Sequence, residues 1–527
     1  MWSWLKNKTI RMNNNLLTFF ENSIFFRIMF SFIIYLKNSS FYNLINQKIK
    51  INPKDSFFSI IAINIYQKIY AKLYFLKYYF DKIISFCLNN ASKKAIFILL
   101  LFIITNEFFR NNILAEIFFV PSLIVLFLIL AINFINLFDD KKKLLTYIFL
   151  IFFFIKIFYF FGAYNFIEFS DEQTVYSELS WKILKYWFYD DNDVYFSGDK
   201  LIINSAVSDS TSYYDFIAMI YYLFGKHFII AKLFNLFIHL ITGILVYSLA
   251  KELFDKKTAI ISTILFYSLF SINLFSIAVI LESFSTFLLV LFFLLLITLN
   301  KFLFRNNYKA IFIVFLIYLV YLLENNVRDY IAGLLPLAFL AWAIVYSVKK
   351  CRVNVFFKNF SIFIFIILIL FSFLNFNEVL SSTTKNITGL LEKTDFYRNI
   401  PEDTGRLEFF QNADVSTIHK SLKFLPIGLT YVFFSVLPSE VKSVDLLSFF
   451  IIDTTIWYFL LFFIFLGTFY AIKNNPVDAS PIITFIILAI IGHALVEGNF
   501  GNLLRHAVQF KTLMLIFGAY GIDKLFQ

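Results

Sequence analysis

An adjacent pair of carboxylates, Asp171 and Glu172, follows an apolar run and opens a long polar stretch of the chain. A partly buried carboxylate at a membrane surface can act as a general base and take a proton from a hydroxyl or an amine. The same residues also fit a helix start, with Ser170 as the N-cap and both acids in the first turn. The two interpretations are compatible, because a residue near a helix start can also be catalytic.

Glu282 is the single charged residue between Lys257 and Lys301, and it falls between two apolar runs. A carboxylate near membrane depth is costly, so it usually faces a cavity or a charged partner. The alternative is a helix cap at the membrane interface. The sequence leaves both interpretations open.

Arginines stand at two of the other breaks between apolar runs. Arg328 could bind a phosphate through its planar fork, or it could form a local ion pair with Glu324 or Asp329. Arg505 is followed by His506 at a predicted helix start, where the helix dipole disfavours a cation. An anionic lipid head group is a candidate for the compensating charge, although His506 alone would fit a structural role at the interface.

The elements that must position these residues are membrane helices. Of the 527 residues, 60% are hydrophobic, well above the share in soluble domains. The apolar residues form runs of about 15–25 residues, the length that crosses a bilayer, without the alternation of barrel strands. The chain is therefore predicted to be all-α, a polytopic bundle of about 11–13 spans whose outer loops carry short helices. The predicted runs are 95–110, 113–138, 144–163, 228–250, 258–277, 283–299, 309–323, 331–347, 355–375, 449–471, 480–496 and 508–525.

The net charge of +11 is carried largely by Lys and Arg in short breaks between these runs. This distribution is a topology signal, not a nucleic-acid site. It places the basic breaks in the cytoplasm and residues 164–227, 278–282, 324–330 and 376–448 on the outer side. The expected location is the plasma or inner membrane, with the chemistry on the outer face.

Four regions are predicted along the chain. Residues 1–94 form a basic, aromatic cytoplasmic or interfacial arm, and residues 95–375 form a transmembrane core that includes the outer loop 164–227. Residues 376–448 form an outer loop with a re-entrant or flat segment near Phe424–Leu437, and residues 449–527 form the last membrane helices. Cys87 and Cys351 lie near predicted cytoplasmic ends, so a structural disulfide is not expected.

The stretch from Phe161 to Leu299 resembles the GT-C superfamily of integral membrane glycosyltransferases, especially the branch with bacterial protein mannosyltransferases and the lipid A aminoarabinose transferase. The order and sidedness of several pieces carry this resemblance. They are Ser170–Glu172 with Tyr176, Tyr213–Gly225 with His227–Phe237, Lys251–Ala259 and Glu282, with weaker likenesses at Asp414–Thr417, Leu425–Gly428 and Gly498–Gly501 with Arg505.

The resemblance implies inverting transfer of a sugar from a polyprenyl-phosphate carrier to a lipid, glycan or protein acceptor. Asp171 matches the catalytic carboxylate of the family, and Glu172 matches its neighbour. Arg328 and Arg505 loosely match arginines that bind phosphate, while Tyr176, Glu282 and His506 are further candidates for substrate binding.

Two other functions remain open. A transporter or flippase for lipid-linked sugars would be expected to show paired broken helices with midplane charges. A surface polysaccharide polymerase or ligase would share large outer loops and arginines. No group of His, Cys or paired carboxylates has a convincing metal-binding spacing, so no cofactor is predicted and a requirement for a divalent cation stays open.

Overall fold

The computed structural model describes the chain over residues 113–138, 143–163, 172–189, 194–197, 200–203, 206–208, 211–302, 307–350, 413–434, 445–497 and 500–526. The predictions for residues 1–94, for the runs 95–110 and 355–375, and for Asp171 itself lie outside these residues. The chain divides into two compact units, of which the second contains all the described residues from Glu172 onward. In the first unit, the described residues form two apolar helices, α6 (Ile113–Phe138) and α7 (Lys143–Ala163).

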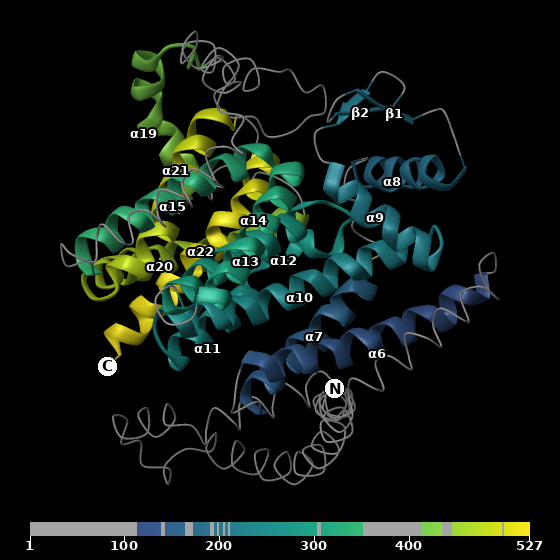
Figure 1. The fold of residues 1–527 in the computed structure, drawn as a ribbon, viewed down its shortest axis with the longest axis horizontal. Helices are drawn as coiled ribbons and strands as arrows, with labels where there is room; N and C mark the ends of the chain where they lie inside the picture. Colours follow the sequence, from purple (N-terminus) through teal and green to yellow (C-terminus); the bar gives the residue numbers. More distant parts are fainter. Residues whose placement is uncertain are drawn as a thin grey trace, which may run out of the picture. The chain divides into compact units, whose positions relative to one another are not determined.

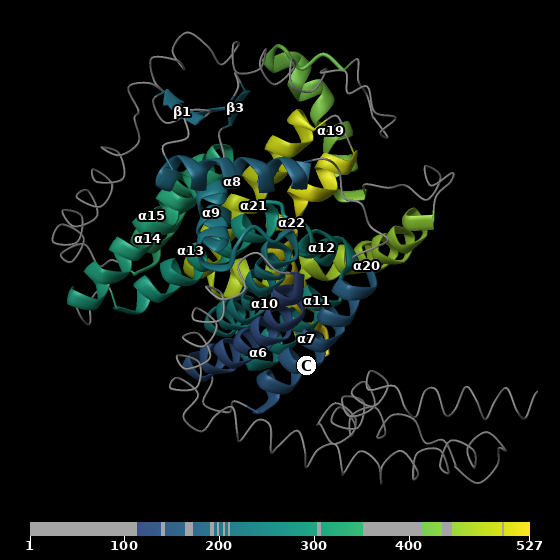
Figure 2. The ribbon, with the colours of Figure 1, turned by 90° about the vertical axis from the view of Figure 1, so that its right-hand side faces the viewer.

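The second unit is a bundle of helices (Figures 1 and 2). Its helices are α8 (Glu172–Tyr189), α9 (Thr211–Phe224), α10 (Phe228–Leu253), α11 (Lys256–Ser268), α12 (Phe270–Leu274), η1 (Phe275–Ile277), α13 (Glu282–Phe302), α14 (Asn307–Val327), α15 (Asp329–Lys350), α19 (Ile418–Phe434), α20 (Asp445–Asn474), α21 (Pro476–Val496) and α22 (Phe500–Leu525). Helix α10 packs on α11 and α13, α15 packs on α21, and α20 packs on α22.

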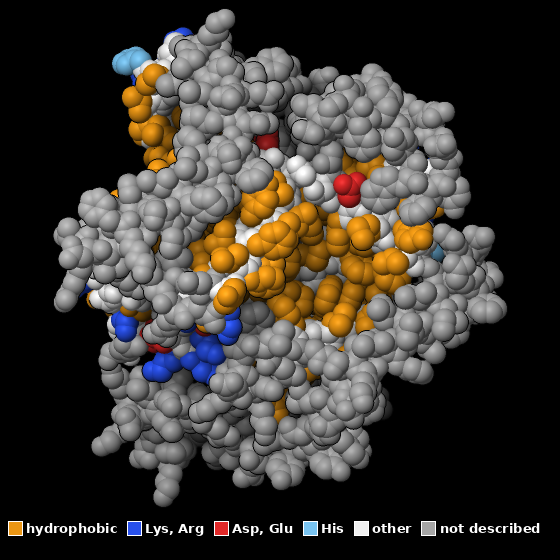
Figure 3. Space-filling model, viewed as in Figure 1, with side chains coloured by type: hydrophobic (Ala, Val, Ile, Leu, Met, Phe, Trp, Pro, Cys, Tyr) orange, Lys and Arg blue, Asp and Glu red, His pale blue; other side chains and the backbone are white. Residues whose placement is uncertain are grey.

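The described residues include seven helices long and apolar enough to cross a membrane, or eight if one bent pair counts as a span. The protein is therefore a multi-pass helical membrane protein, as the apolar runs predict. Apolar side chains cover the part of the bundle visible in Figure 3, with Lys and Arg gathered near α11. Helix α22 covers the predicted run 508–525 but is not among the seven; it carries Arg505, Lys511 and Asp523 along its length.

A small antiparallel sheet lies within the predicted outer loop 164–227, where only short helices were expected. Its strands β1 (Val194–Ser197), β2 (Lys200–Ile203) and β3 (Ala206–Ser208) pair in sequence order between α8 and α9. These strands have three or four residues each, too few for alternation to stand out from the sequence.

The predicted run 258–277 is broken. Helix α11 ends at Ser268, and the pair formed with Phe270–Ile277 is bent by 65°. Asp453 of α20 accepts hydrogen bonds from the backbone N–H of Phe270 at 2.7 Å and of Ser271 at 3.3 Å. A carboxylate at these positions satisfies N–H groups that the break leaves without helical partners.

One end of the bundle is basic. Five helix termini there carry lysines: the last turns of α10, α13, α20 and α22 and the start of α11. Contacts join these termini, including the stacked rings of Phe254 and Tyr520, 3.9 Å apart, and the hydrogen bond from Asn475 to the Leu253 carbonyl at 2.6 Å. The lysines that the sequence scatters over three breaks and the last turn of α22 therefore share one end.

Candidate functional site

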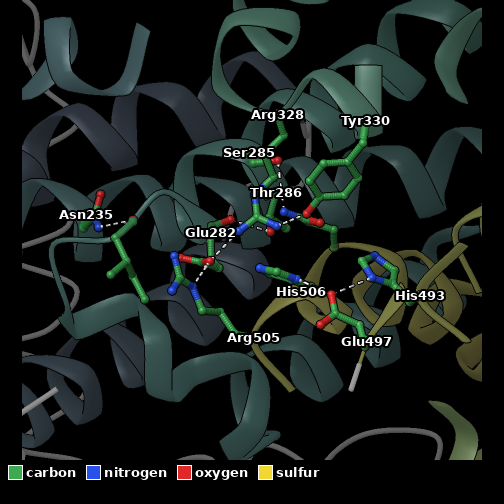
Figure 4. Close-up of polar contacts among 12 residues, drawn as sticks. Asn235, Glu282, Ser285, Thr286, Arg328, Tyr330, His493, Glu497, Arg505 and His506 are labelled. Atoms are coloured by element: carbon green, nitrogen blue, oxygen red, sulfur yellow. Dashed lines mark hydrogen bonds and ion pairs between the residues drawn. The ribbon is translucent and has the colours of Figure 1, made fainter. Parts of the chain in front are cut away.

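The opposite ends of α13, α14, α15, α21 and α22 bring together several of the residues singled out from the sequence. Glu282 is the first residue of α13, and Arg328 lies between α14 and α15. Arg505 lies in the second turn of α22. Figure 4 shows both guanidinium groups directed at the Glu282 carboxylate.

A single carboxylate oxygen receives both arginines. Glu282 Oε1 accepts a hydrogen bond from Arg328 Nη2 at 2.5 Å and another from Arg505 Nε. The Glu282 side chain is 0% exposed, while those of Arg328 and Arg505 are 4% and 13% exposed. Charges this deeply buried are tolerated only when they are paired.

The segment before Glu282 is fixed by a buried amide. Asn235 of α10 donates hydrogen bonds to the carbonyl oxygens of Ala278 at 2.5 Å and Ile280 at 2.8 Å. These bonds satisfy backbone groups where the chain turns between η1 and α13. Asn235 thus helps to set where α13 begins and where Glu282 stands.

A second buried carboxylate, Glu324, lies one helical turn before Arg328. Glu324 of α14 accepts a hydrogen bond from Ser285 Oγ at 2.5 Å, and Gln509 Nε2 donates to the same hydroxyl at 3.1 Å. The sequence left open an ion pair of Arg328 with Glu324 or Asp329. The carboxylate that pairs with Arg328 is instead Glu282, 46 positions away in the chain.

Tyr330 links the arginine pair to a group of histidines. Arg328 Nη1 donates to the Tyr330 hydroxyl, and the guanidinium lies 5.6 Å from the ring centre. The same ring lies 6.0 Å from the ring of His493 and 6.2 Å from that of His506. One aromatic ring therefore contacts both clusters.

The histidines flank a buried glutamate. Glu497 Oε1 lies 2.5 Å from His506 Nδ1 and 3.3 Å from His493 Nδ1. Burial alone would raise the pKa of Glu497, but the charge of His506 and hydrogen bonds from both histidines outweigh it and hold that pKa well below its usual range. Among the described residues, these three are also a group that could hold a metal ion.

Tyr176 of α8 faces the ring pair of α9, with its ring 5.2 Å from Tyr214 and 5.4 Å from Tyr213. Burial raises the pKa of the Tyr176 hydroxyl, whereas the positive charge of Arg505 lowers it and the negative charge of Glu282 raises it. Tyr176 thus lies within the electrostatic field of the arginine pair.

The structure therefore brings some of the predicted site residues together but not all of them. Glu282, Arg328 and Arg505 meet, while Tyr176 and His506 lie close to them. Glu172 is the first residue of α8, one turn before Tyr176, and Asp171 lies outside the described residues. The catalytic roles assigned to Asp171 and Glu172 remain predictions.

Sequence reasoning missed His493, because it lies inside the predicted apolar run 480–496. Its signal was the spacing of His493 and Glu497, four residues apart at the end of a helix. Residues at this spacing share one helix face. Glu324, Ser285 and Gln509 were not predicted to form a buried network.

No protein-family model and no curated protein sequence matches the chain. Among solved structures, it is similar to the Archaeoglobus fulgidus oligosaccharyltransferase in the apo form, with a TM-score of 0.46 and 14% identity over 73% of this chain. The archaeal oligosaccharyltransferase AglB from the same organism, in complex with an inhibitory peptide and a dolichol-phosphate, gives the same values. This chain spans about half the length of both structures, with 51% of each covered.

Proposed function

We propose that this protein is a membrane glycosyltransferase that moves a sugar from a polyprenyl-phosphate carrier to an acceptor on the non-cytoplasmic face. The observation that carries the proposal is the convergence of Arg328 and Arg505 on one buried point at the end of the bundle. Two guanidinium forks at one point suit a phosphate group better than they suit a single carboxylate oxygen.

The hydrogen bonds of Arg328 support a ligand with several acceptor oxygens. A guanidinium has five N–H donors. Within the part of the chain that the structure describes, Arg328 Nη2 and Nη1 have partners but Nε is buried without one. A phosphate oxygen would satisfy such a donor, and the guanidinium would stabilise the negative charge that develops on the phosphate as the sugar leaves.

Asp171 is the proposed general base, with Glu172 assisting. The acceptor oxygen or nitrogen forms a bond to the anomeric carbon, and its proton passes to the Asp171 carboxylate. The bond between that carbon and the phosphate oxygen breaks, and its electron pair stays on the phosphate between the arginines. The position of Tyr176 supports this arrangement, because it ties α8, which begins at Glu172, to the field of the arginine pair.

The basic end of the bundle supports the proposed sidedness. The lysines at the termini of α10, α11, α13, α20 and α22 lie at the end opposite Glu282. Basic residues favour the cytoplasmic side. The arginine pair, the donor phosphate and the acceptor then belong to the outer side, with residues 376–423 proposed to cover the site or select a lipid, glycan or protein acceptor.

Transfer from a labelled polyprenyl-phosphate sugar, measured in proteoliposomes, tests the proposal. Asp171→Asn should lower the rate about 10²–10⁴-fold, the usual contribution of a general base. Glu178→Gln is the matched control, since this acid lies a few residues further along the chain, on α8, in an exposed ion pair with Lys226. The transfer rate of this variant should stay close to that of wild type. Unchanged transfer by Asp171→Asn would assign the base elsewhere, with Glu172 tested next.

One observation keeps a transporter as the second candidate. The bent pair of α11 and α12 is a broken helix of the kind that transporters use. Its break is capped by Asp453, and no second broken helix is found among the described helices. If wild type transfers no sugar from any carrier but moves labelled lipid-linked sugar across the vesicle membrane, transport replaces transfer as the function.

A further inference from the structure

The group formed by His493, Glu497 and His506 has the composition of a metal site. One ligand atom from each residue, an imidazole nitrogen or a carboxylate oxygen, lies within 4.8 Å of the other two. Two histidines and one carboxylate are a ligand set that zinc proteins use when a fourth position is kept open. The proposed sugar transfer assigns no role to His493 or Glu497.

The distances can be compared with those around a tetrahedral ion. Ligands about 2.0–2.2 Å from zinc stand roughly 3.3–3.6 Å from one another. The 3.3 Å between His493 Nδ1 and Glu497 Oε1 already fits that value. The 2.5 Å between His506 Nδ1 and the same oxygen is the length of a hydrogen bond, so this pair would have to separate by about 1 Å to admit an ion.

The surrounding structure holds the three side chains in place. His493 and Glu497 occupy adjacent turns at the end of α21, and His506 faces them from the second turn of α22. The side chains of His493 and Glu497 are 6% and 9% exposed, and the ring of Phe510 lies 5.5 Å from that of His493. Buried ligands on two packed helices need little reordering to bind an ion.

We propose that His493, Glu497 and His506 bind a divalent transition-metal ion of the zinc class, with one coordination position open. The proposal does not depend on the proposed sugar transfer. With both imidazoles neutral, as metal ligation requires, a dication bound to Glu497 leaves one net positive charge. Arg328, linked to both histidine rings through Tyr330, adds to that charge, so the open position suits an anionic oxygen ligand such as hydroxide or phosphate.

The competing interpretation is a network without metal, in which both imidazoles donate Nδ1–H to Glu497. Such a network gives stability but no saturable metal binding. The two interpretations therefore differ in a measurement that needs neither substrate nor activity.

The experiment uses the full chain, purified in detergent and treated with a chelator. Zn²⁺ is then added, and bound metal is measured by equilibrium dialysis and mass spectrometry. Wild type should bind a single zinc ion per chain, and Co²⁺ in its place should give the visible absorption of a four-coordinate site. His493→Ala and Glu497→Gln should each weaken binding at least tenfold, and Zn²⁺ should no longer raise the melting temperature.

His419→Ala is the matched control, because His419 lies exposed on α19 and is not a member of the group. The zinc affinity of this variant should equal that of wild type. If His506→Ala does not fold, His506→Gln keeps a hydrogen-bond donor and removes the metal ligand. The proposal is overturned if wild type binds no zinc saturably. Equal affinity in a folded His493→Ala variant, or a six-coordinate cobalt spectrum, would also overturn it.

Discussion

Glu282 shows how much a single side chain can contribute to the stability of this bundle. Its carboxylate is fully buried, and it balances two guanidinium groups that would otherwise repel each other. Breaking a buried ion pair by removing one partner typically costs about 3–5 kcal/mol, because the remaining charge stays buried without compensation.

We therefore expect Glu282→Gln to lower the free energy of unfolding by about 3–5 kcal/mol. A short-chain prenyl phosphate should then raise the melting temperature of the variant more than that of wild type, since its phosphate can replace the lost charge. Thermal unfolding in detergent, with and without the prenyl phosphate, measures both effects.

The matched control is Glu252→Gln, which removes the acid of an exposed pair with Lys301. Exposed pairs contribute about 0–1 kcal/mol, so this variant should have a melting temperature close to that of wild type. The prenyl phosphate should raise the melting temperatures of Glu252→Gln and wild type by the same amount. If Glu282→Gln and Glu252→Gln unfold at the same temperature, Glu282 does not balance the arginines.

Single residues were predictable here, but their partners were not. Glu282, Arg328 and Arg505 each stood out because a charge near an apolar run is costly. Their meeting joins positions 46 and 223 residues apart, which no local pattern encodes. The interpretation of Arg328 as a local ion pair differs from the structure for that reason.

Helices α20 and α22 pack closely against each other at glycine residues. They approach so closely that a Cβ on Gly467 would stand 1.8 Å from the Phe517 carbonyl oxygen, and one on Gly521 would stand 2.1 Å from that of Phe463. Small residues of this kind let membrane helices pack backbone against backbone. The two glycines thus fix how near α22, and Arg505 with it, can come to α20.

Gly467→Ala should therefore force the two backbones apart and destabilise the protein by about 1–3 kcal/mol, as overpacking does. Gly333→Ala on α15 is the control, because nothing lies within 4 Å of the added methyl group. Alanine there should leave stability unchanged or raise it by about 0.4–1 kcal/mol. Chemical denaturation of both variants checks this, and equal stability for the two would show that α20 and α22 do not touch at Gly467.

The membrane helices were easier to predict from the sequence than the breaks within them. The apolar runs indicated membrane helices because length and composition are local properties. The break at Leu269 was missed because the Asp453 carboxylate that caps it lies on another helix. The group of His493, Glu497 and His506 was missed for another reason: its members are close in the sequence, but His493 lies inside a predicted apolar run.

At the scale of the whole molecule, the two ends of the bundle differ in charge, and the orientation proposed above follows from that difference. Single cysteines in a chain with Cys87→Ser and Cys351→Ser can test it. Lys226→Cys, just before α10, should react with a membrane-impermeant maleimide in intact cells. Lys301→Cys, beside the end of α10, should react only after permeabilisation.

The side chains of Lys226 and Lys301 are both partly exposed, at 33% and 52%. A difference in labelling would therefore not come from a difference in solvent exposure. The reverse labelling pattern would invert the orientation and move the arginine pair to the cytoplasmic side. Labelling of both positions in intact cells would contradict their assignment to opposite faces.

The cap on the broken helix has a consequence for how the protein is made. Asp453 is translated 183 residues after Phe270, whose backbone it caps. At about 5–20 residues per second, the ribosome needs roughly 10–40 s to cover that distance. During this interval the α11–α12 segment is inserted without its cap, and in lipid an unsatisfied N–H is costly. A straight helix would satisfy these N–H groups. We therefore expect this segment of the nascent chain to stay one straight helix until α20 has been inserted.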